Sequence, residues 1–173
     1  MISIIVPCFN EQHIISDFIA EINKVIHEID SEFEIIIIDN NSTDETWNCI
    51  KSANDKFSKF KFIKLSNYFG KEAAILAGLD HATGDAAIIM DPDLEDPPEL
   101  IEKMIENWKN GSDVVLTQRT SEKISITKKI LKSFFYKILI LSANSNEKIY
   151  SDSGDFRLID KKILIELKKM RER

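Results

Sequence analysis

The stretch IIMDPDLEDPPELI, residues 88–101, decides the fold class of this chain. It starts as an apolar run of strand length, passes Asp91, Asp93, Glu95 and Asp96, and then reaches the adjacent prolines Pro97 and Pro98. Beyond the prolines, Leu100, Met104, Ile105 and Trp108 follow the spacing of one helix face. A buried strand that leads through a polar turn into a helix is the unit from which α/β proteins are built.

The same unit recurs along the chain. Ile14, Phe18, Ile22 and Ile26 recur at steps of four after the first apolar run, as they would on one face of a helix. Strands that are apolar on both faces and alternate with helices are typical of a mainly parallel sheet covered on each side. There is no repeat, low-complexity segment or linker, so we expect residues 1–173 to form one domain. The expected strands are ISIIV (2–6), FEIIIID (33–39), KFKFIKL (59–65), AAIIMD (86–91) and DVVLTQ (113–118).

Composition and charge narrow the functions that this chain can serve. Its 173 residues are 43% hydrophobic, which is enough for one sizeable core. The net charge of −6 argues against nucleic acid as a partner, because binding a phosphate backbone needs a concentrated basic surface. Cys8 and Cys49 have no redox or metal spacing, so we expect free thiols in a reducing compartment. The N-terminus lacks a signal peptide and no window is apolar enough to span a bilayer, so we expect a cytoplasmic chain.

The polar segments after the first four strands should meet at one edge of the sheet, where ligands bind in proteins of this class. No glycine occurs before Gly70, so the glycine-rich phosphate loops of dehydrogenases and P-loop NTPases cannot follow the first strand. A bound diphosphate would then be neutralised by a divalent cation that carboxylates hold. The four segments are PCFNE (7–11), DNNSTDE (39–45), SNYFGKE (66–72) and DPDLEDPPE (91–99).

The acidic cluster in the last of these segments has two interpretations. Asp91 and Asp93 point to the same side of an extended chain, and hard oxygen ligands suit Mg²⁺ or Mn²⁺. Neighbouring carboxylates repel one another unless a cation or a helix terminus compensates them. Asp96 and Glu99 fit a structural role, because an acid before two prolines is typical of a helix N-terminus. We therefore predict a metal site at Asp91 and Asp93 and a helix cap at Asp96.

Two more side chains at this edge each have a functional and a structural interpretation. Asp39 ends the second strand, where an acid can accept hydrogen bonds from a ribose or a base. Its structural interpretation is as part of the turn and helix cap that residues 42–45 supply. Lys71 follows Gly70 and either reaches a phosphate or is a solvated residue at a helix start.

The polar segments form a set of linked motifs in a fixed order. They are VPCFNE (6–11), DNNSTDET (39–46), NYFGKEAAILAGLDHATGD (67–85), MDPDLEDPPELI (90–101) and GDFRLID (154–160). In this order and spacing the chain resembles the family 2 glycosyltransferases, and most of all the dolichyl- and undecaprenyl-phosphate sugar transferases. The resemblance covers nearly the whole chain. It implies a GT-A fold, a UDP- or GDP-sugar donor, a divalent metal, and inversion at the anomeric carbon.

The resemblance also assigns roles to individual residues. Asp91 and Asp93 become the Asp-x-Asp pair, with Asp93 as the direct metal ligand and Asp91 also beside the nucleotide-sugar. Lys71 is placed near the nucleoside or the phosphates. The remaining residues that the resemblance places around the nucleoside are Pro7, Asn10, Glu11 and Asp39.

Three positions depart from the pattern of the family. The turn after the second strand often reads Asp-Asp-Gly-Ser, whereas this chain has Asn40 and Asn41 at the middle positions. Asn41 can still adopt the left-handed conformation that glycine would supply. Glu95 stands where the lipid-phosphate transferases usually have Gln, and Pro92 replaces a small residue. These departures bear on base preference, metal geometry and sugar choice.

The acceptor is expected to bind through cations. A lipid phosphate is already an anion, so it needs no strong general base, unlike a sugar hydroxyl. Lysines stand beside large apolar residues in ITKKILKSFFYKILIL (126–141), which suits either an interfacial helix at acidic lipid head groups or an ordinary amphipathic helix on the sheet. The residues expected to hold the acceptor phosphate are Arg119, Lys129, Lys132 and Ser133.

The segment GDFRLID (154–160) leaves the acceptor chemistry open. Asp155 would be a catalytic base for a hydroxyl acceptor, or would orient Arg157 to grip a phosphate bidentately. A third interpretation is a buried Asp–Arg pair that only holds a strand.

From these observations we expect an enzyme that moves a sugar from UDP or GDP to polyprenyl phosphate at the cytosolic face of a membrane. A first alternative is a family 2 transferase that acts on a saccharide hydroxyl in polysaccharide synthesis. A second is a noncatalytic module that binds a sugar nucleotide or a membrane surface. The chain stops at KKMRER, inside what would be the next helix of the family, so we expect a truncated catalytic domain whose exposed apolar surface favours self-association.

Overall fold

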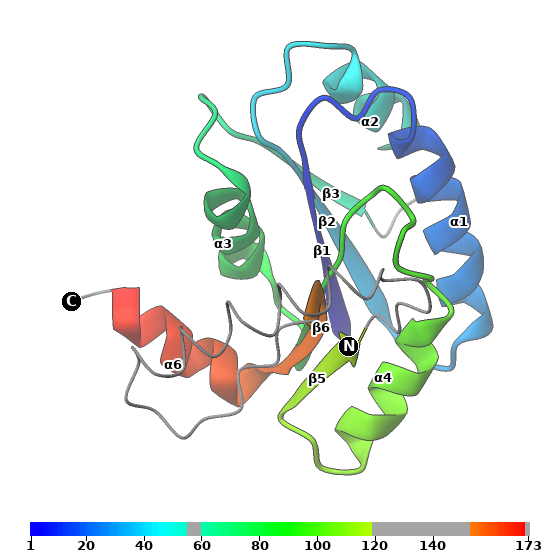
Figure 1. Cartoon of the computed structure of the whole chain (residues 1–173), viewed down its shortest axis with the longest axis vertical. Helices are drawn as coiled ribbons and strands as arrows, with labels where there is room; N and C mark the ends of the chain where they lie inside the picture. The colour runs from blue at the N-terminus through cyan, green and yellow to red at the C-terminus, as the bar shows by residue number, and fades with distance from the viewer. Residues whose placement is uncertain (55–59, 119–152, 172–173) are drawn as a thin grey trace, which may run out of the picture. The chain divides into compact units, whose positions relative to one another are not determined.

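The computed structural model describes residues 1–54, 60–118 and 153–171. Almost all of them belong to one compact unit, which comprises Met1–Leu116 and Asp155–Arg173, while Thr117–Gly154 forms a second unit. The elements, labelled in Figure 1, are β1 (Ile2–Cys8), α1 (Ile15–Glu28), β2 (Phe33–Asp39), α2 (Thr46–Asn54), β3 (Phe60–Lys64), α3 (Lys71–His81), β4 (Ala86–Ile89), α4 (Leu100–Lys109), β5 (Val114–Gln118), β6 (Ser153–Asp160) and α6 (Lys161–Arg171).

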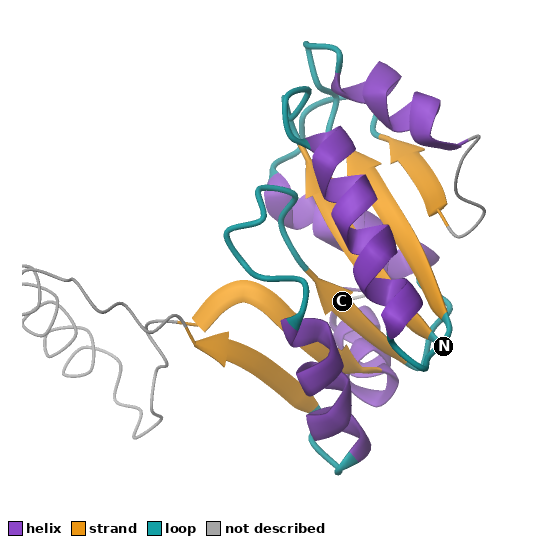
Figure 2. Cartoon of the chain, turned by 90° about the vertical axis from the view of Figure 1, so that its right-hand side faces the viewer, coloured by secondary structure: helices purple, strands orange, loops and turns teal. Residues whose placement is uncertain are grey.

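The described strands form one sheet in the order β3-β2-β1-β4-β6-β5. β1 pairs in parallel with both β2 and β4, and β2 pairs in parallel with β3. β6 pairs with β4 in the antiparallel sense. The predicted α/β fold with a mainly parallel sheet is confirmed, and Figure 2 shows helices on both sides of the strands. The position of β6 beside β4 brings the segment GDFRLID next to the strand that carries the acidic cluster.

Strand limits follow the predicted apolar runs closely. β2 coincides with the predicted run 33–39, and β1 continues two residues beyond the predicted 2–6. The extension arises because Pro7 and Cys8 stay in register with Ile38 and Asp39 of β2. The carboxyl ends of β1 and β2 therefore lie level, with Cys8 opposite Asp39.

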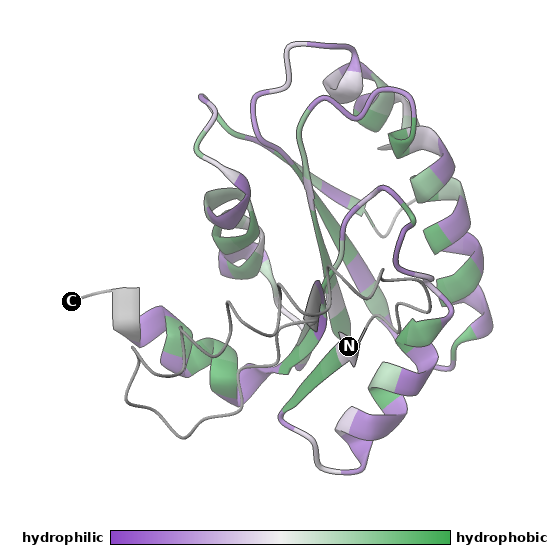
Figure 3. Ribbon diagram, in the orientation of Figure 1, coloured by the Kyte–Doolittle hydropathy of each residue, from purple (hydrophilic) through white to green (hydrophobic). Residues whose placement is uncertain are grey.

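The core consists of two apolar layers, one on each face of the sheet. Successive side chains of a strand point to opposite faces, so Ile4 belongs to the layer that contains Phe18 of α1 and Ile101 of α4. Ile5 belongs to the other layer, with Ala74 of α3 and Leu164 of α6. The hydrophobic colour in Figure 3 accordingly runs along the inner strands and down one side of the helices.

Helix α3 packs very closely on the sheet at Gly78. A Cβ atom at this position would lie 2.5 Å from Ile5 Cγ2 and 2.6 Å from Ile38 Cδ1. These distances are shorter than real carbon contacts, so the approach of the helix depends on glycine. Because Lys71 is the first residue of α3, this packing also sets how close Lys71 lies to the carboxyl edge of the sheet.

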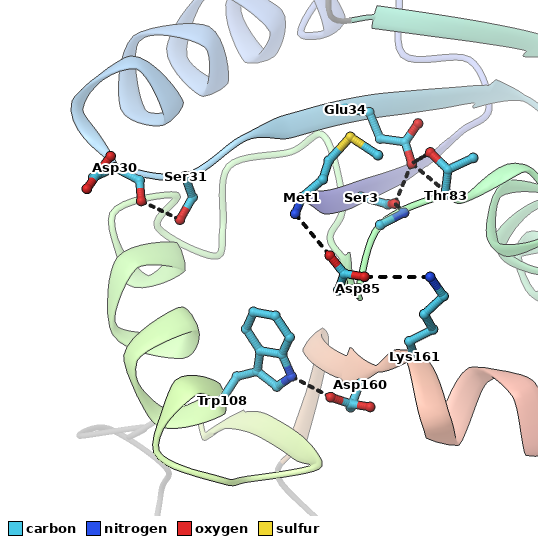
Figure 4. A network of polar contacts seen from close by, with 11 residues as sticks. Met1, Ser3, Asp30, Ser31, Glu34, Thr83, Asp85, Trp108, Asp160 and Lys161 are labelled. Atoms are coloured by element: carbon cyan, nitrogen blue, oxygen red, sulfur yellow. Dashed lines mark hydrogen bonds and ion pairs between the residues drawn. The ribbon is translucent and has the colours of Figure 1, made fainter.

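The amino edge of the sheet holds a buried polar network around Glu34, shown in Figure 4. The Glu34 carboxylate is 7% exposed and accepts hydrogen bonds from Ser3 Oγ at 2.6 Å, Lys61 Nζ at 2.6 Å, Thr83 N at 2.6 Å and Thr83 Oγ1 at 2.9 Å. Burial alone would raise the pKa of Glu34, but these hydrogen bonds outweigh it and lower the pKa to about 2. The network ties β1, β2, β3 and the turn before β4 together at the amino ends of the strands, opposite the polar segments that follow their carboxyl ends.

Candidate active site

The loops that follow β1 and β2 hold each other through side-chain hydrogen bonds. Asn10 N donates to Ser42 Oγ at 2.9 Å, and Asn10 Oδ1 accepts from Thr43 N at 2.9 Å. Gln12 N donates to Asp44 Oδ2 at 3.2 Å, so the two loops meet at several points. Asp44 Oδ1 also accepts from Thr46 N at 3.0 Å and thereby caps the start of α2, as the sequence predicted for this turn.

Two asparagines in these loops have left-handed backbone conformations. Asn41 has φ of 61°, which confirms the expectation that it replaces glycine in this turn. Asn10 has φ of 58°, which the sequence did not predict. Asparagine tolerates this region better than most residues because its short polar side chain bonds locally, as the Asn10 amide does with Thr43.

The acidic loop after β4 turns sharply at Leu94, whose φ is 57°. A leucine in this region costs about 1–2 kcal/mol, and the partly buried Leu94 side chain packs against the core layer below α1 and α4. Asp93 beside it is exposed, and its Oδ1 accepts a hydrogen bond from Glu95 N at 3.0 Å. Anchoring Leu94 therefore presents Asp93 to solvent.

The predicted helix cap at Asp96 is wrong in position. Helix α4 begins at Leu100 with Glu99 at its N-cap, and Leu100 N and Ile101 N bond the carbonyls of Pro97 and Pro98. The two prolines therefore belong to a turn that precedes the helix, and their carbonyls accept the bonds that lead into it. Asp96 is buried, which agrees with a structural role for this acid.

The carboxyl ends of β1, β2 and β4 meet around a pocket of about 210 Å³. The sequence placed five of its lining residues at a ligand site, namely Pro7, Glu11, Lys71, Asp91 and Asp93. Five more line it without having been predicted as site residues, namely Cys8, Phe9, Asn40, Tyr68 and Pro92. The gathering of polar segments at one edge of the sheet is thereby confirmed.

Two aromatic side chains that line this pocket, Phe9 and Tyr68, were not predicted as site residues. The rings of Phe9 and Tyr68 have centroids 4.5 Å apart and an interplanar angle of 51°. Both rings are exposed, Tyr68 by 54%. The signal in the sequence was an aromatic residue beside the polar residues of each of two edge segments, PCFNE and SNYFGKE.

Lys71 connects three elements at the mouth of this site. Its Nζ lies 2.7 Å from Asp91 Oδ2 and 2.6 Å from Asp155 Oδ2. Partial burial alone would lower the pKa of Lys71, but the hydrogen bonds to Asp155 and Asp91 and the charges of both carboxylates raise it. Lys71 is therefore a protonated cation that contacts both the loop after β4 and strand β6.

Asp155 lies between two cations. Besides Lys71, it is contacted by Arg157, whose Nη2 donates to Asp155 Oδ1 at 3.0 Å. The hydrogen bond from Lys71 is the main cause of a lowered pKa of Asp155; burial opposes it, and the charges of Lys71 and Arg157 add to it. Of the interpretations of this segment, an Asp–Arg pair is observed, and the two side chains are partly exposed rather than buried.

The pocket itself is strongly negative. Burial, followed by the charges of Asp93, Asp91 and Asp44, raises the pKa of Glu11 above its ordinary value. Burial and the charges of Glu11, Asp39 and Asp91 likewise raise the pKa of the Cys8 thiol, so this thiol is protonated and unreactive at neutral pH. A site with this field favours a cation.

Asp39 and Asn10 do not line the pocket, and their predicted contact with a nucleoside stays a prediction. The Asp39 side chain is fully buried; its Oδ1 accepts from Ser42 N at 3.0 Å, while its Oδ2 has no hydrogen-bond partner among the described residues. Lys64 Nζ lies 3.6 Å from Oδ2 and is partly exposed. Both oxygens of a buried carboxylate are normally satisfied, so Asp39 can still accept a hydrogen bond from a ligand.

A metal would depend on a ligand as well as on the protein. In the described part of the chain, no three His, Cys, Asp or Glu side chains converge in a way that would hold an ion by themselves. Mg²⁺ and Mn²⁺ are usually bound by one or two carboxylates together with waters and substrate phosphates. The donor set of Asp91 and Asp93 in a negative pocket fits that kind of site.

The residues expected to hold the acceptor phosphate lie outside the described ranges. These are Arg119, Lys129, Lys132 and Ser133. Within residues 1–54, 60–118 and 153–171, no helix has the length and apolar character needed to cross a membrane.

Comparison with known proteins decides the family. Residues 3–168 match the model of the family described as glycosyl transferase family 2. The chain belongs to this family. Its six-stranded sheet with helices on both faces is the GT-A fold, as its structural neighbours also show.

Longer relatives match this family 2 transferase over nearly all of its length. It is 36% identical to the uncharacterized glycosyltransferase YkcC of Bacillus subtilis over 99% of this chain and 53% of YkcC. It is 38% identical to the prophage bactoprenol glucosyl transferase homolog of Escherichia coli over 99% of this chain and 56% of that protein. The chain thus spans about half the length of the curated relatives that it matches.

A solved structure with the same fold is the mannosyltransferase PcManGT from Pyrobaculum calidifontis, in complex with GDP-Man and Mn²⁺. It superposes with a TM-score of 0.64 at 20% sequence identity, over 96% of this chain and 46% of PcManGT. At this identity the similarity establishes the fold alone.

Proposed function

We propose that this family 2 transferase moves a sugar from a nucleoside diphosphate to a polyprenyl phosphate, with Mg²⁺ or Mn²⁺ at Asp91 and Asp93. A relative at 38% identity is named as a bactoprenol glucosyl transferase homolog, which supports a lipid phosphate as acceptor. The complex of a structural neighbour with GDP-Man and Mn²⁺ supports a nucleotide-sugar donor and a divalent metal. The work would take place at a membrane surface, because the acceptor is a lipid.

The donor would bind along the carboxyl ends of β1, β2 and β4. Asp39 Oδ2, which has no hydrogen-bond partner among the described residues, would accept a hydrogen bond from the nucleoside. The exposed rings of Phe9 and Tyr68, which line the pocket, would contact a flat base or a sugar. The diphosphate would lie toward Asp91, Asp93 and Lys71, and a metal held by the two aspartates would neutralise charge on the leaving diphosphate. Lys71 would add hydrogen bonds to phosphate oxygens from the start of α3.

The observation that carries the choice of acceptor is the position of Asp155 between Lys71 and Arg157. A base that removes a proton from a sugar hydroxyl works best with a pKa near the operating pH. The two cations lower the pKa of Asp155 instead, so it is a poor base. A phosphate acceptor is already ionised and needs no base, and Arg157, oriented by Asp155, would contact its oxygens.

Inversion follows from attack on the face of the sugar opposite the diphosphate. The acceptor phosphate would approach from the side of β6, where Arg157 lies, while the diphosphate leaves toward Asp91 and Asp93. Preorganised charges at both ends would stabilise the transition state, in which negative charge moves from acceptor to leaving group. The predicted contributions of Arg119, Lys129, Lys132 and Ser133 to acceptor binding remain part of this proposal.

The test is a transfer assay with radiolabelled sugars. The chain is incubated with labelled UDP-glucose or GDP-mannose and undecaprenyl phosphate in detergent, with and without Mn²⁺. We expect label in the organic phase with one of the two donors, and only when Mn²⁺ is present. Label that appears only on added glycans would replace the lipid acceptor by a saccharide hydroxyl, and nucleotide binding without any transfer would refute catalysis by this chain.

A further inference from the structure

A protein cation contacts one carboxylate of the expected metal site. Lys71 Nζ lies 2.7 Å from Asp91 Oδ2, within the distance of a charge-assisted hydrogen bond. The same ammonium lies 2.6 Å from Asp155 Oδ2, so it is held from two sides. Asp93 by contrast is exposed, and its Oδ1 accepts a hydrogen bond from the amide of Glu95.

An ammonium and a dication cannot both bind closely to Asp91 without strong repulsion. A metal would lie about 2.1 Å from a carboxylate oxygen, which puts it only a few ångströms from the Lys71 ammonium if that contact persists. Like charges this close repel each other strongly. The partial solvent exposure of the site reduces this repulsion but does not remove it. A metal that arrives alone must therefore either displace Lys71 from Asp91 or bind Asp93 alone.

A diphosphate removes this conflict because it offers Lys71 another anion. Lys71 is the first residue of α3 and its side chain is partly exposed, so the ammonium can move from Asp91 toward a ligand while α3 stays in place. Asp155, already contacted by Arg157, can keep the other side of the ammonium. Metal and diphosphate would then each favour the binding of the other.

We propose that Lys71 is an internal counter-ion that occupies Asp91 until a nucleoside diphosphate arrives and then transfers to the phosphates, so that metal and nucleotide bind cooperatively. This inference rests on the proposed function, and it adds an order of events to it. The Lys71 ammonium offsets part of the negative charge of the pocket before a nucleotide binds. It also disfavours capture of free metal ions by the site in the absence of a donor.

The test compares the affinity for Mn²⁺ alone, by electron paramagnetic resonance of the free ion, in the wild type and in Lys71→Met. We expect Mn²⁺ alone to bind about tenfold more tightly to the variant, within the usual range of coupling between two sites. In the wild type, UDP or GDP should raise the Mn²⁺ affinity about tenfold or more. In the variant the increase should be smaller, because only direct coordination by the phosphates remains and no Lys71 contact with Asp91 has to be released.

Two control variants separate direct competition from a general loss of positive charge. Lys61→Met removes the same charge from a lysine–carboxylate pair of 2.6 Å at the opposite edge of the sheet. Arg157→Met removes a cation that contacts Asp155 and leaves Lys71 on Asp91. Both should bind Mn²⁺ within about twofold of the wild type. An equal gain in Arg157→Met and Lys71→Met, or no gain in Lys71→Met, would overturn the inference.

A second measurement does not depend on the variant being folded. In crystal structures of the wild type with and without Mn²⁺ and nucleotide, the distance from Lys71 Nζ to Asp91 should increase from 2.7 Å to beyond hydrogen-bond reach. If the contact persists in the ternary complex, the inference is wrong while the proposed function stands. If Mn²⁺ binds none of these proteins even with nucleotide, the metal-dependent function itself fails.

Discussion

Replacing Glu34 by Gln should reveal how much of the stability of this fold comes from one buried carboxylate. The side chain lies 7% exposed between β1, β3 and the turn before β4, and it accepts four hydrogen bonds, one of them from the Lys61 ammonium. Glutamine has nearly the same shape but lacks the charge, and its NH₂ group would face a donor. The substitution therefore removes charge-assisted bonds and leaves packing largely intact.

The magnitude follows from the pKa of Glu34, which the network lowers from 4.5 to about 2. Each unit of difference between the folded and unfolded pKa corresponds to about 1.4 kcal/mol, so the ionised form contributes about 3 kcal/mol at neutral pH. Because the folded pKa is the lower one, this contribution is fully present above pH 4.5. It is lost as the pH falls toward 2, where the folded state also takes up the proton.

The assay is urea unfolding followed by circular dichroism at several pH values between 7 and 3. We expect Glu34→Gln to be about 3 kcal/mol less stable than the wild type at pH 7, and the difference to shrink below pH 4.5. Glu32→Gln, at an exposed position two residues away, is the matched control and should change little. A loss below about 1 kcal/mol in Glu34→Gln, or a loss that does not change with pH, would show that the network does not stabilise the ionised form.

Three further variants test the site and the helix that carries Lys71. Asp93→Asn should weaken Mn²⁺-dependent binding of UDP or GDP at least about tenfold by calorimetry while leaving the melting temperature unchanged, because Asp93 is exposed; unchanged affinity would remove Asp93 from the metal site. Asp39→Asn should weaken nucleotide binding but leave pyrophosphate binding unchanged, and it should change the free energy of unfolding by less than about 1 kcal/mol. An equal loss of affinity for both ligands would contradict a contact between Asp39 and the nucleoside. Gly78→Ala should lower the free energy of unfolding, measured in urea, by roughly 1–2 kcal/mol, because overpacking against Ile5 and Ile38 outweighs the gain in helix propensity. A more stable variant would contradict the tight packing of α3.

The parallel part of the fold could be predicted because its strands are apolar on both faces. The run FEIIIID gave the limits of β2 without error, since every residue of that strand is buried and the polar turn follows directly. β6 could not be placed in the sheet by the same reasoning. Nothing in the residues of GDFRLID specifies an antiparallel strand beside β4, because that pairing depends on contacts between segments about seventy residues apart.

The site was predictable where a residue type carries its own chemistry. Asp91, Asp93, Glu11 and Lys71 are charged side chains at strand ends, and all four line the pocket. Tyr68 was missed, because an aromatic side chain is apolar enough for a core and only its exposure in the folded protein distinguishes a binding surface from packing. The bond from Lys71 to Asp155 was also beyond sequence reasoning, since it requires β6 to lie beside β4.

Strand β2 carries a buried carboxylate near each end, and the two differ in how completely they are hydrogen-bonded. Glu34 at the amino end accepts hydrogen bonds at both carboxylate oxygens, and its charge stabilises the folded state. Asp39 at the carboxyl end is fully buried, yet one of its oxygens has no hydrogen-bond partner in the described residues. An unsatisfied buried polar atom costs about 1–3 kcal/mol, and a ligand that donates to it would recover this free energy on binding. The amino edge of the sheet thus stabilises the fold, while Asp39 Oδ2 at the carboxyl edge has only the Lys64 ammonium near it, at 3.6 Å, and the proposed nucleoside contact would add the missing hydrogen bond.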